Sequence, residues 1–180
     1  GPEAFTEVRY LAHHKQLQAL GLIPERAEEF AERFGRESGG LIAPYRTEGA
    51  DTLVVALGSI NGTIKDLVDE HRDEGQAVGA VKVVSFRPFP LGELRGALSR
   101  AARVVVVEKD LALGLGGIVA SNVPMALRGL TTPVYTVIAG LGGRPITKAS
   151  LARAIGEAMA DRLDDPHFLD LDWSIVDREL

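Results

Sequence analysis

The feature that most constrains this chain is an alternation, between residues 51 and 160, of short apolar runs with longer segments of helical pattern. Each run is continuous and of strand length, which is typical of a strand buried on both faces of a parallel sheet. The runs predict strands at residues 52–57, 77–85, 103–108 and 132–138. The segments between and after them predict helices at about residues 63–74, 91–101, 117–127 and 151–159. This repeat predicts an α/β fold, a mostly parallel sheet of about five strands with helices on both faces.

The chain before this pattern predicts a helical segment and a linker. Apolar residues occur at helical spacing through residues 3–35, and Pro24 stands where a proline best opens a helix, so we expect two helices there. Gly35 is placed as a helix stop, and residues 36–50 are expected to form a loop. The predicted division is an N-terminal helical segment and linker, an α/β domain and a docking tail, at residues 1–50, 51–160 and 161–180.

Both ends of the chain suggest a part of something larger. The first residues are Gly1-Pro2 and not Met, either the remnant of a cleaved tag or native sequence, and we expect a piece of a longer protein. In the tail, Pro166 breaks the last helix, and the residues after it become apolar again. We expect these side chains to dock, on this domain or on a partner: Phe168, Leu169, Leu171, Trp173 and Ile175.

Composition excludes several classes of protein. The chain has no cysteine, so it can form no disulfide, thiolate zinc site or iron–sulfur cluster ligated by its own side chains. A net charge of −5, without any run of basic residues, argues against a nucleic-acid-binding face. The apolar runs are too short to span a membrane, and the first residues do not resemble a signal peptide. We therefore expect a cytoplasmic protein without nucleic-acid or membrane partners.

Two glycine-containing turns have features of nucleotide-binding loops but match neither motif. The turn at residues 114–117 follows Glu108 too late for a dinucleotide fingerprint, and Val119 stands where the third glycine belongs. A plain turn, or an anion nest at a helix N-terminus, is the better interpretation. The turn at residues 58–63 lacks the P-loop lysine. We interpret it as a turn that caps the next helix, with ligand contact through Ser59 as the alternative.

The sequence shows no constellation of catalytic or metal-binding residues. His13 and His14 are adjacent, so they point to different sides of a helix and cannot share a metal ion. His71 is expected on an exposed helix surface, and the Gly-x-Ser-x-Gly motif of many hydrolases is missing. We therefore assign no catalytic residue, no cofactor-binding residue and no metal ligand.

Three basic residues, Arg87, Lys109 and Arg144, stand in loops beside predicted strands. If these loops lie at one edge of the sheet, the residues form a small positive cluster. The alternative is a set of surface ion pairs with nearby acids such as Glu108 and Asp110. The candidate residues for contact with a subunit or an anion are Ser59, Arg87, Lys109, Gly142, Gly143 and Arg144.

Several loop motifs follow one another in a characteristic order. They are Ala56-Leu57-Gly58-Ser59 with Gly62-Thr63-Ile64-Lys65, Phe86-Arg87-Pro88-Phe89-Pro90, Glu108-Lys109-Asp110, and Ala139-Gly140-Leu141-Gly142-Gly143-Arg144. With Glu7-Val8-Arg9-Tyr10 and Phe34-Gly35-Arg36, this order resembles the C-terminal half of the α subunit of pyruvate:ferredoxin oxidoreductases. The resemblance covers essentially the whole chain.

The resemblance implies a fold like the C-terminal domain of transketolase, within a complex that oxidatively decarboxylates a 2-oxoacid. The complex uses thiamine diphosphate, Mg²⁺, iron–sulfur clusters and coenzyme A, and it passes electrons to ferredoxin. The family binds thiamine diphosphate and Mg²⁺ on other segments, so no catalytic residue is carried over to this chain. The stretches at residues 108–117 and 140–144 are similar to the pyruvate branch, and 2-ketoisovalerate relatives are close.

The expected function is therefore a scaffold and subunit-contact domain of a 2-oxoacid:ferredoxin oxidoreductase. The resemblance implies partners that bind thiamine diphosphate and iron–sulfur clusters, with ferredoxin as an indirect partner. The isolated 180 residues are expected to be inactive and to bind no cofactor. The alternative is a freestanding small-molecule or nucleotide-binding α/β module.

Overall fold

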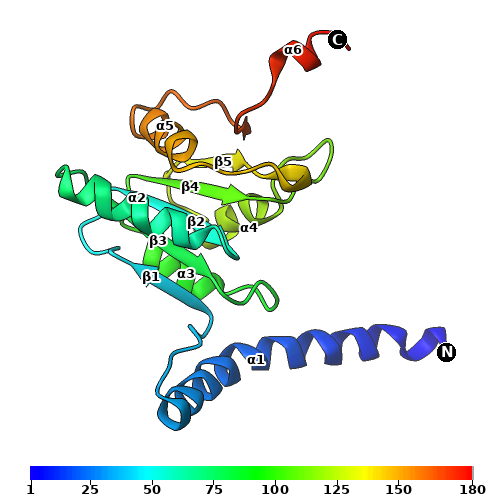
Figure 1. Ribbon diagram of the computed structural model, residues 1–180. Coiled ribbons are helices and arrows are strands. Elements are labelled where there is room, and N and C mark those ends of the chain that lie inside the picture. Colours follow the sequence, from blue (N-terminus) through cyan, green and yellow to red (C-terminus); the bar gives the residue numbers. More distant parts are fainter. Residues whose placement is uncertain (180) are drawn as a thin grey trace.

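The structure is a computed structural model that describes residues 1–179 of the 180 (Figure 1). Over these residues the chain folds into a central sheet with helices around it and a long helix that projects from one side (Figure 1). In chain order the helices and strands are η1 (Pro2–Ala4), α1 (Phe5–Phe34), β1 (Ile42–Tyr45), β2 (Thr52–Leu57), α2 (Asn61–Asp73), β3 (Val78–Val83), α3 (Leu91–Leu98), β4 (Arg103–Glu108), α4 (Ile118–Ala126), β5 (Val134–Ile138), η2 (Leu141–Gly143), α5 (Lys148–Met159), β6 (His167–Phe168) and α6 (Trp173–Val176).

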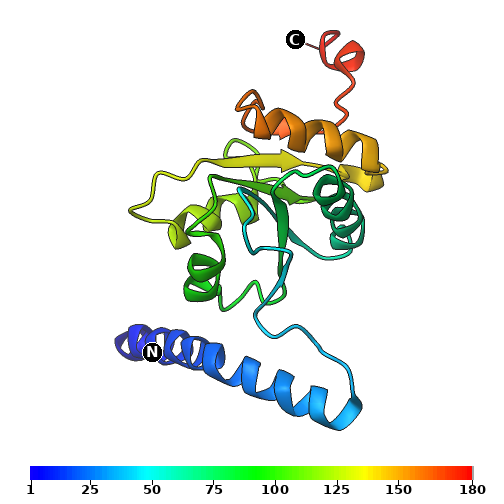
Figure 2. The ribbon, with the colours of Figure 1, turned by 90° about the vertical axis from the view of Figure 1, so that its left-hand side faces the viewer.

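The strands of the described chain form one six-stranded sheet in the order β1-β3-β2-β4-β5-β6. Only β1 runs antiparallel to its neighbour, and the other four neighbouring pairs are parallel. Helices α2 and α5 pack on one face, and α3 and α4 pack on the other (Figures 1 and 2). The predicted α/β class, with a mostly parallel sheet and a preceding helical segment, is confirmed. The sheet exceeds the predicted five strands because short strands, β1 and β6, complete its two edges.

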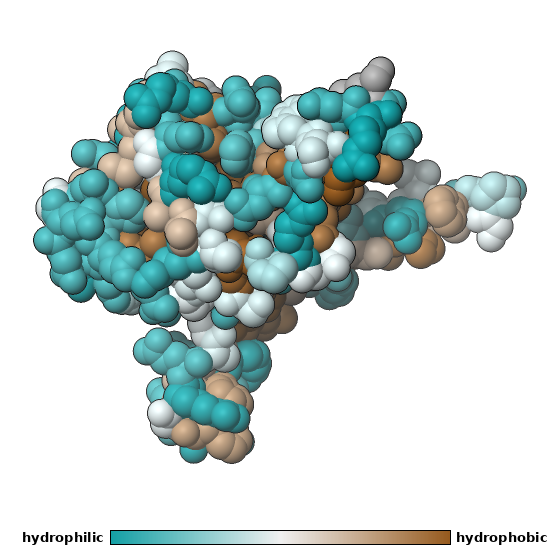
Figure 3. Space-filling model, turned by 45° about the horizontal axis from the view of Figure 1, so that its top comes forward, coloured by the Kyte–Doolittle hydropathy of each residue, from teal (hydrophilic) through white to brown (hydrophobic). Residues whose placement is uncertain are grey.

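Helix α1 is continuous, so the prediction of two helices before residue 36 is wrong. Pro24 lies inside α1, although it has no N–H to donate to the carbonyl of Leu20. Good helix formers on both sides, such as Leu22 and Glu25, carry the helix through that position. Gly35 ends α1 as predicted, in the left-handed conformation with φ of 65°. In the space-filling view α1 stands clear of the body, with hydrophobic residues among the hydrophilic ones (Figure 3).

Strand β1 corrects the prediction that residues 36–50 form only a loop. It pairs with β3, and its first residue lies opposite Val83. Pro44 cannot donate a ladder hydrogen bond, which an edge strand tolerates. The turn after β1 is fastened by Arg72 on α2, whose Nη2 donates to the carbonyl oxygens of Arg46 at 2.7 Å and Glu48 at 3.0 Å. The strand was missed because its partner lies far along the chain.

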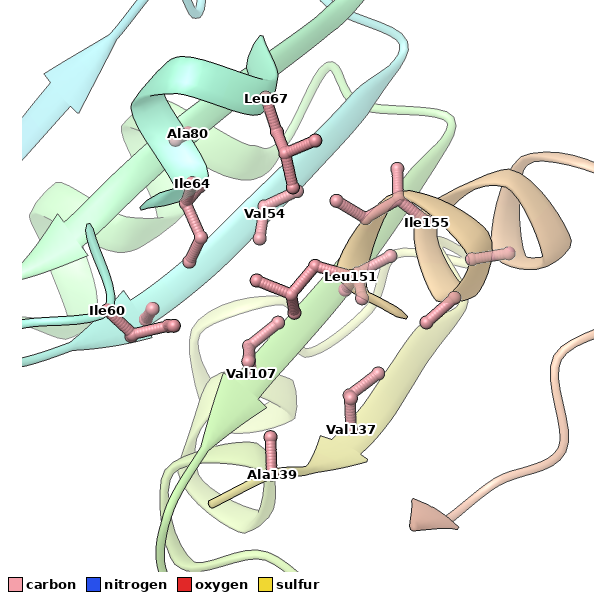
Figure 4. Close-up of a cluster of buried hydrophobic side chains, with 14 of the residues drawn as sticks. Val54, Ile60, Ile64, Leu67, Ala80, Val107, Val137, Ala139, Leu151 and Ile155 are labelled. Atoms are coloured by element: carbon pink, nitrogen blue, oxygen red, sulfur yellow. The ribbon is translucent and has the colours of Figure 1, made fainter. Parts of the chain in front are cut away.

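The core is built from strands whose side chains alternate between the two faces of the sheet. In β4, Val105 and Val107 face α2 and α5, whereas Val104 and Val106 face α3 and α4. All four valines are at most 1% exposed, which explains why the run reads as continuously apolar. Figure 4 shows the first of these two clusters, where Leu67 of α2 and Leu151 and Ile155 of α5 pack over the strands.

The tail docks on the domain at its start and points outward at its end. Strand β6 pairs with β5, and Leu169, directly after it, is buried. Trp173 and Ile175 on α6 are 60% and 55% exposed, so they do not dock on this chain. The sheet thus takes one strand from residues 1–50 and one from residues 161–180, and the division of the chain at these boundaries stays a prediction.

Candidate functional site

The loops that follow β2, β3, β4 and β5 lie along one edge of the sheet, the carboxyl edge, because these strands are parallel. Open α/β sheets bind ligands at this edge. The loops carry Ser59, Arg87, Lys109 and Arg144, in that order along the chain. The loops of Arg87, Lys109 and Arg144 thus lie at one edge of the sheet, as the predicted positive cluster requires. Whether the three side chains form a cluster depends on the residues that each of them contacts.

Arg87 is held against aromatic rings and carries no ion pair within the described chain. Its guanidinium carbon lies 4.0 Å from the ring centroid of Phe86 and 5.8 Å from that of Phe89. Its Nη2 donates to the side-chain oxygen of Asn122 on α4 at 3.3 Å. Aromatic faces attract a guanidinium without neutralising it, so an exposed positive charge remains on the α3–α4 side of the edge.

Arg144 connects the loop after β5 to the tail. Its Nη1 donates to the carbonyl oxygen of Asp170, whose carboxylate accepts from Arg153 Nη2 at 2.9 Å. The Ser174 hydroxyl, which donates to Asp172 at 2.7 Å, lowers the pKa of that carboxyl group, and the nearby Arg144 charge lowers it further. Beside Arg144 lies a pocket of about 200 Å³ with a mostly apolar lining that includes Leu141. Arg144 therefore has a structural task in positioning the tail.

Glu108 does not form the ion pair that the sequence suggested as the alternative. It is 3% exposed, and its carboxylate accepts from the backbone N–H groups of Val119 at 2.7 Å and Ala120 at 2.9 Å. An acid in this position satisfies free amides at the N-terminus of α4 and interacts favourably with the helix dipole. A Cβ on Gly117 would lie 2.1 Å from this carboxylate, which explains the glycine. The anion nest predicted here is thus filled by the chain's own Glu108.

Lys109 and Ser59 are exposed at the same edge. The Lys109 side chain passes over Gly140, where an added Cβ would lie 3.1 Å from its Cε. No side chain caps the start of α2, which differs from the expectation of a turn that caps this helix. Contact of Ser59 with a ligand stays a prediction. Asn61 closes the turn, because its side-chain nitrogen donates to the carbonyl oxygen of Gly58 at 2.9 Å.

The carboxyl edge does not gather the three basic residues into one cluster. Three strand spacings of about 4.8 Å separate β3 from β5, which places the loops of Arg87 and Arg144 roughly 14 Å apart. Arg87 lies against α4, whereas Arg144 lies against the tail and Lys109 near Gly140. Their roles in subunit or anion contact, with those of Ser59, Gly142 and Gly143, stay a prediction.

Two features of the structure were not foreseen. Leu113 and Leu115, between β4 and α4, are 91% and 76% exposed, and the alternation of leucines with glycines there was the available signal. His71 was expected to be exposed, but it is half-buried and paired through Nδ1 with Gln76. Its Nε2 is buried and has no hydrogen-bond partner among the described residues.

The residues present do not fit the cofactors that the resemblance implies. No group of three or more histidine or carboxylate side chains in residues 1–179 could hold a metal ion. Iron–sulfur clusters need thiolates, which the sequence lacks. The N-terminus of α4, the natural place for a diphosphate, holds the Glu108 carboxylate, which would repel it. In this same described part, none of the helices is both long and apolar enough to cross a membrane.

The fold defines a class, a transketolase-like α/β domain. Two solved structures share the fold. One is a 2-oxoglutarate:ferredoxin oxidoreductase from Magnetococcus marinus, with a TM-score of 0.52 and 19% identity over 72% of this chain and 21% of that one. The other is a split-gene transketolase described as an inactive β4 tetramer, with a TM-score of 0.51 and 22% identity over 62% of this chain and 40% of that one. At these identities the likeness shows the fold alone, and it confirms the transketolase-like prediction.

Sequence comparison identifies the family. Residues 50–151, more than half of the chain, match the pyruvate:ferredoxin oxidoreductase core domain II family, and the chain belongs to it. The pyruvate synthase subunit PorA of Methanothermobacter thermautotrophicus is 38% identical over 154 residues, which are 86% of this chain and 39% of that protein. The chain thus spans about two fifths of that relative's length. The resemblance read from the loop motifs is confirmed.

Proposed function

We propose that this chain is a non-catalytic subunit-contact domain of a 2-oxoacid:ferredoxin oxidoreductase whose 2-oxoacid is pyruvate. Such a complex oxidatively decarboxylates the 2-oxoacid to an acyl-CoA and passes the electrons to ferredoxin. The family match supports the class of enzyme, and the similarity to a pyruvate synthase subunit supports the choice of pyruvate. Thiamine diphosphate, Mg²⁺, the iron–sulfur clusters and coenzyme A are then bound by other domains or subunits.

Helix α1 is the observation that carries the contact role. It has 30 residues, and none of them is buried in the described chain. Phe5, Tyr10 and Leu11 are 63%, 65% and 57% exposed. Most helices in proteins are stabilised by packing of an apolar face, and exposed apolar side chains in this number mark an interaction surface. Helix α1 therefore requires a partner surface, which the rest of the enzyme supplies.

The loops of the carboxyl edge add a second contact region. Arg87 and Lys109 are exposed and form no ion pair within residues 1–179, so they are free to meet acidic groups of a neighbouring subunit or of a coenzyme A molecule that this subunit binds. Gly142 and Gly143 have positive φ values of 64° and 83°, which other residues rarely adopt. These glycines give the loop before Arg144 a shape that a side chain would strain.

Charge reversal in the complete complex tests the contact role. Arg87→Glu and Arg144→Glu are expected to weaken assembly or to raise the KM for coenzyme A by about tenfold. Arg100→Glu, an exposed change before β4 at the opposite edge, is the matched control and is expected to leave both unchanged. Arg144 also contacts the tail at Asp170, so part of the effect of Arg144→Glu can come from a displaced tail. Arg153→Ala removes the hydrogen bond from Arg153 to the Asp170 carboxylate and measures that part. Normal assembly and kinetics in both reversal variants would overturn the proposal.

A freestanding ligand-binding module is the second candidate, favoured by a pocket of about 530 Å³ between α1 and β1. This volume falls in the usual range for small-molecule sites. The carboxylates of Glu28, Glu37 and Glu93 line it, however, and would repel the phosphates of a nucleotide or of coenzyme A. A thermal-shift series with thiamine diphosphate, coenzyme A and nucleotides separates the two functions. The contact role predicts no saturable shift, and a saturable shift would favour the module.

A further inference from the structure

The edge of the sheet at β1 is open on its outer side. Strand β1 is the last strand at its end of the sheet, so β3 pairs with only one of its two sides. Helix α1 lies beyond the open side (Figures 1 and 2), and the pocket of about 530 Å³, here the edge groove, lies between the two. One wall of the edge groove includes Ala27 and Ala31 of α1, and the other is formed by residues 41–44. The groove thus follows the strand edge residue by residue.

The backbone of β1 directs unused hydrogen-bonding groups toward the edge groove. The Val84 N–H donates to the carbonyl oxygen of Leu41 at 3.0 Å, so Leu41 is one of the residues that bond to the neighbouring strand. In an antiparallel pair, such residues alternate with residues whose N–H and carbonyl groups point away from that neighbour. Ile42 and Pro44 are therefore the outward residues. Within residues 1–179, no turn, loop or side-chain hydrogen bond takes up the Ile42 N–H or the carbonyl oxygens of Ile42 and Pro44.

Small residues leave room in the edge groove for a backbone that approaches β1. Ala27 and Ala31 line it from α1, and Gly39 and Gly40 line it from the linker. The two glycines have positive φ values of 90° and 59°, which other residues rarely adopt. The linker therefore passes along the groove without side chains at these positions. The space is thus available to an additional strand.

The charge of the edge groove is negative. Glu28 of α1, Glu37 of the linker and Glu93 of α3 line it, and no lysine, arginine or histidine does. None of these three carboxylates takes part in an ion pair of the described chain. A segment that carries cationic side chains would complement this lining, and an acidic segment would be repelled.

We infer that the edge groove binds an extended, basic segment of another protein, which adds to the sheet as a strand beside β1. The backbone of this segment accepts from the Ile42 N–H and donates to the carbonyl oxygens of Ile42 and Pro44. Its lysine or arginine side chains face the three carboxylates of the groove. In such strand addition the main-chain hydrogen bonds supply affinity and the side chains supply specificity. This inference goes beyond the proposed function, because the contacts proposed for α1 and the carboxyl edge do not require a filled edge groove.

A short peptide of alternating valine and lysine is the probe for the edge groove. Fluorescence anisotropy of the labelled peptide with the 180-residue chain measures binding, and so short a strand edge predicts a Kd on the order of 100 µM. A peptide of alternating valine and glutamate is expected to bind at least roughly tenfold more weakly. Bound valine–lysine peptide should also slow the hydrogen exchange of the Ile42 N–H, because that group gains an acceptor.

Replacing the acids shows whether the charge of the edge groove selects the segment. The double change of Glu28→Gln with Glu37→Gln is expected to raise the Kd of the valine–lysine peptide by about tenfold, because two exposed ion pairs are lost. Glu32→Gln is the matched control, since Glu32 is also exposed on α1 but does not line the groove. Its Kd is expected to equal that of the wild type.

Methylation of alternate backbone nitrogens of the peptide shows whether a strand forms. One set of methyl groups blocks the N–H groups that donate to Ile42 and Pro44 and is expected to weaken binding at least roughly tenfold, whereas the other set points away from β1 and leaves the Kd unchanged. Equal Kd values of the two methylated peptides would overturn the inference. So would the absence of saturable binding up to about 1 mM, equal binding of the valine–glutamate peptide, or equally tight binding of N-acetyl-lysine amide. None of these results bears on the proposed function, which is measured by assembly and kinetics of the complete complex.

Discussion

The sheet with its four covering helices buries its apolar side chains, whereas helix α1 of the same chain exposes them. In the sheet, Val54, Val78 and Val106 have no exposed surface. In α1, no residue of the described helix is buried, and large apolar side chains such as Phe5 and Tyr10 are open to solvent. Figures 1 and 2 show the difference as a layered body with a separate helix beneath it.

This difference indicates that the sheet and its covering helices are responsible for folding, whereas α1 is a surface for partners. Each buried aliphatic side chain of the body contributes about 1.5–3 kcal/mol, so the body can fold without α1. Helix α1 gains little by burial here, and its stability depends on the surface that it meets in the complete enzyme. The comparison predicts that mutations in the body change folding, whereas mutations in α1 change assembly.

The largest expected effect is a cavity in the body. Leu151→Ala, at a fully buried position of α5, is expected to lower the free energy of unfolding by about 2–5 kcal/mol. Leu17→Ala removes the same atoms from α1, where the side chain is 48% exposed, and is expected to change it by less than about 0.5 kcal/mol. Urea unfolding followed by circular dichroism measures both. Equal effects would contradict the division between body and α1.

A smaller effect is expected where the body fixes the loop between β4 and α4, residues 109–117. Glu108→Ala leaves the N–H groups of Val119 and Ala120 without their acceptor and is expected to cost about 1–3 kcal/mol of stability. Hydrogen exchange should also become faster at residues 111–120, but not in α1. Asp110→Ala is the matched control, because this neighbouring carboxyl group is exposed and forms no ion pair in the described chain. An unchanged stability in Glu108→Ala would show that the amides find another acceptor.

The body could be predicted from the sequence because its signals are local. Strand β4 has the bounds that its valine run predicted, residues 103–108, and α5 ends at Met159 as predicted, although it begins at Lys148 and not at residue 151. Strand β1 and the continuous α1 could not be predicted in the same way. The first depends on pairing with β3, and the second on helix formers that outweigh the local effect of Pro24.

The candidate site was predictable in position but not in its contacts. Parallel strands place Arg87, Lys109 and Arg144 at one edge, as the sequence indicates. Their partners come from distant segments, since Arg87 meets Asn122 on α4 and Arg144 meets the tail. Spacing along the chain therefore predicts which loop holds each residue, but not which residues it contacts. For this reason the sequence suggested that Glu108 is a surface acid.

Helix capping gives the next comparison, with an expected effect of about 1 kcal/mol. The Thr147 Oγ1 accepts from the Ser150 N–H at 3.1 Å, so Thr147→Ala removes the cap of α5 and should destabilise the body by that amount. Helix α1 begins at Phe5, and its N-cap residue Ala4 has no side chain that could accept a capping hydrogen bond. Ala4→Ser is expected to leave global unfolding unchanged, because α1 contributes nothing to the core. A thermal-unfolding comparison of the two variants checks this, and a stabilising Ala4→Ser would mean that α1 and the body unfold together.

The smallest expected effect is a dependence of stability on pH at Asp161, which ties the end of α5 to the sheet. Hydrogen bonds from Arg103, and then from Tyr135 at 3.1 Å, lower the pKa of Asp161 below its ordinary value. A lowered pKa adds stability above the unfolded value of about 3.9, and that stability is lost as the pH falls through the folded value. Asp161→Asn should therefore lower the Tm at neutral pH, and its Tm should converge with that of the wild type as the pH falls through the lowered pKa of Asp161.

Asparagine is the suitable replacement, because Asp161 has a φ of 52° and asparagine tolerates this conformation. The matched control is Arg26→Gln, which breaks an exposed ion pair with Glu29 inside α1. Because that pair joins no part of the body, Arg26→Gln should leave the Tm unchanged across the same pH range. If both variants instead lost the same Tm at neutral pH, surface ion pairs in α1 and in the body would be equivalent, and α1 would have to be counted as part of the folding unit.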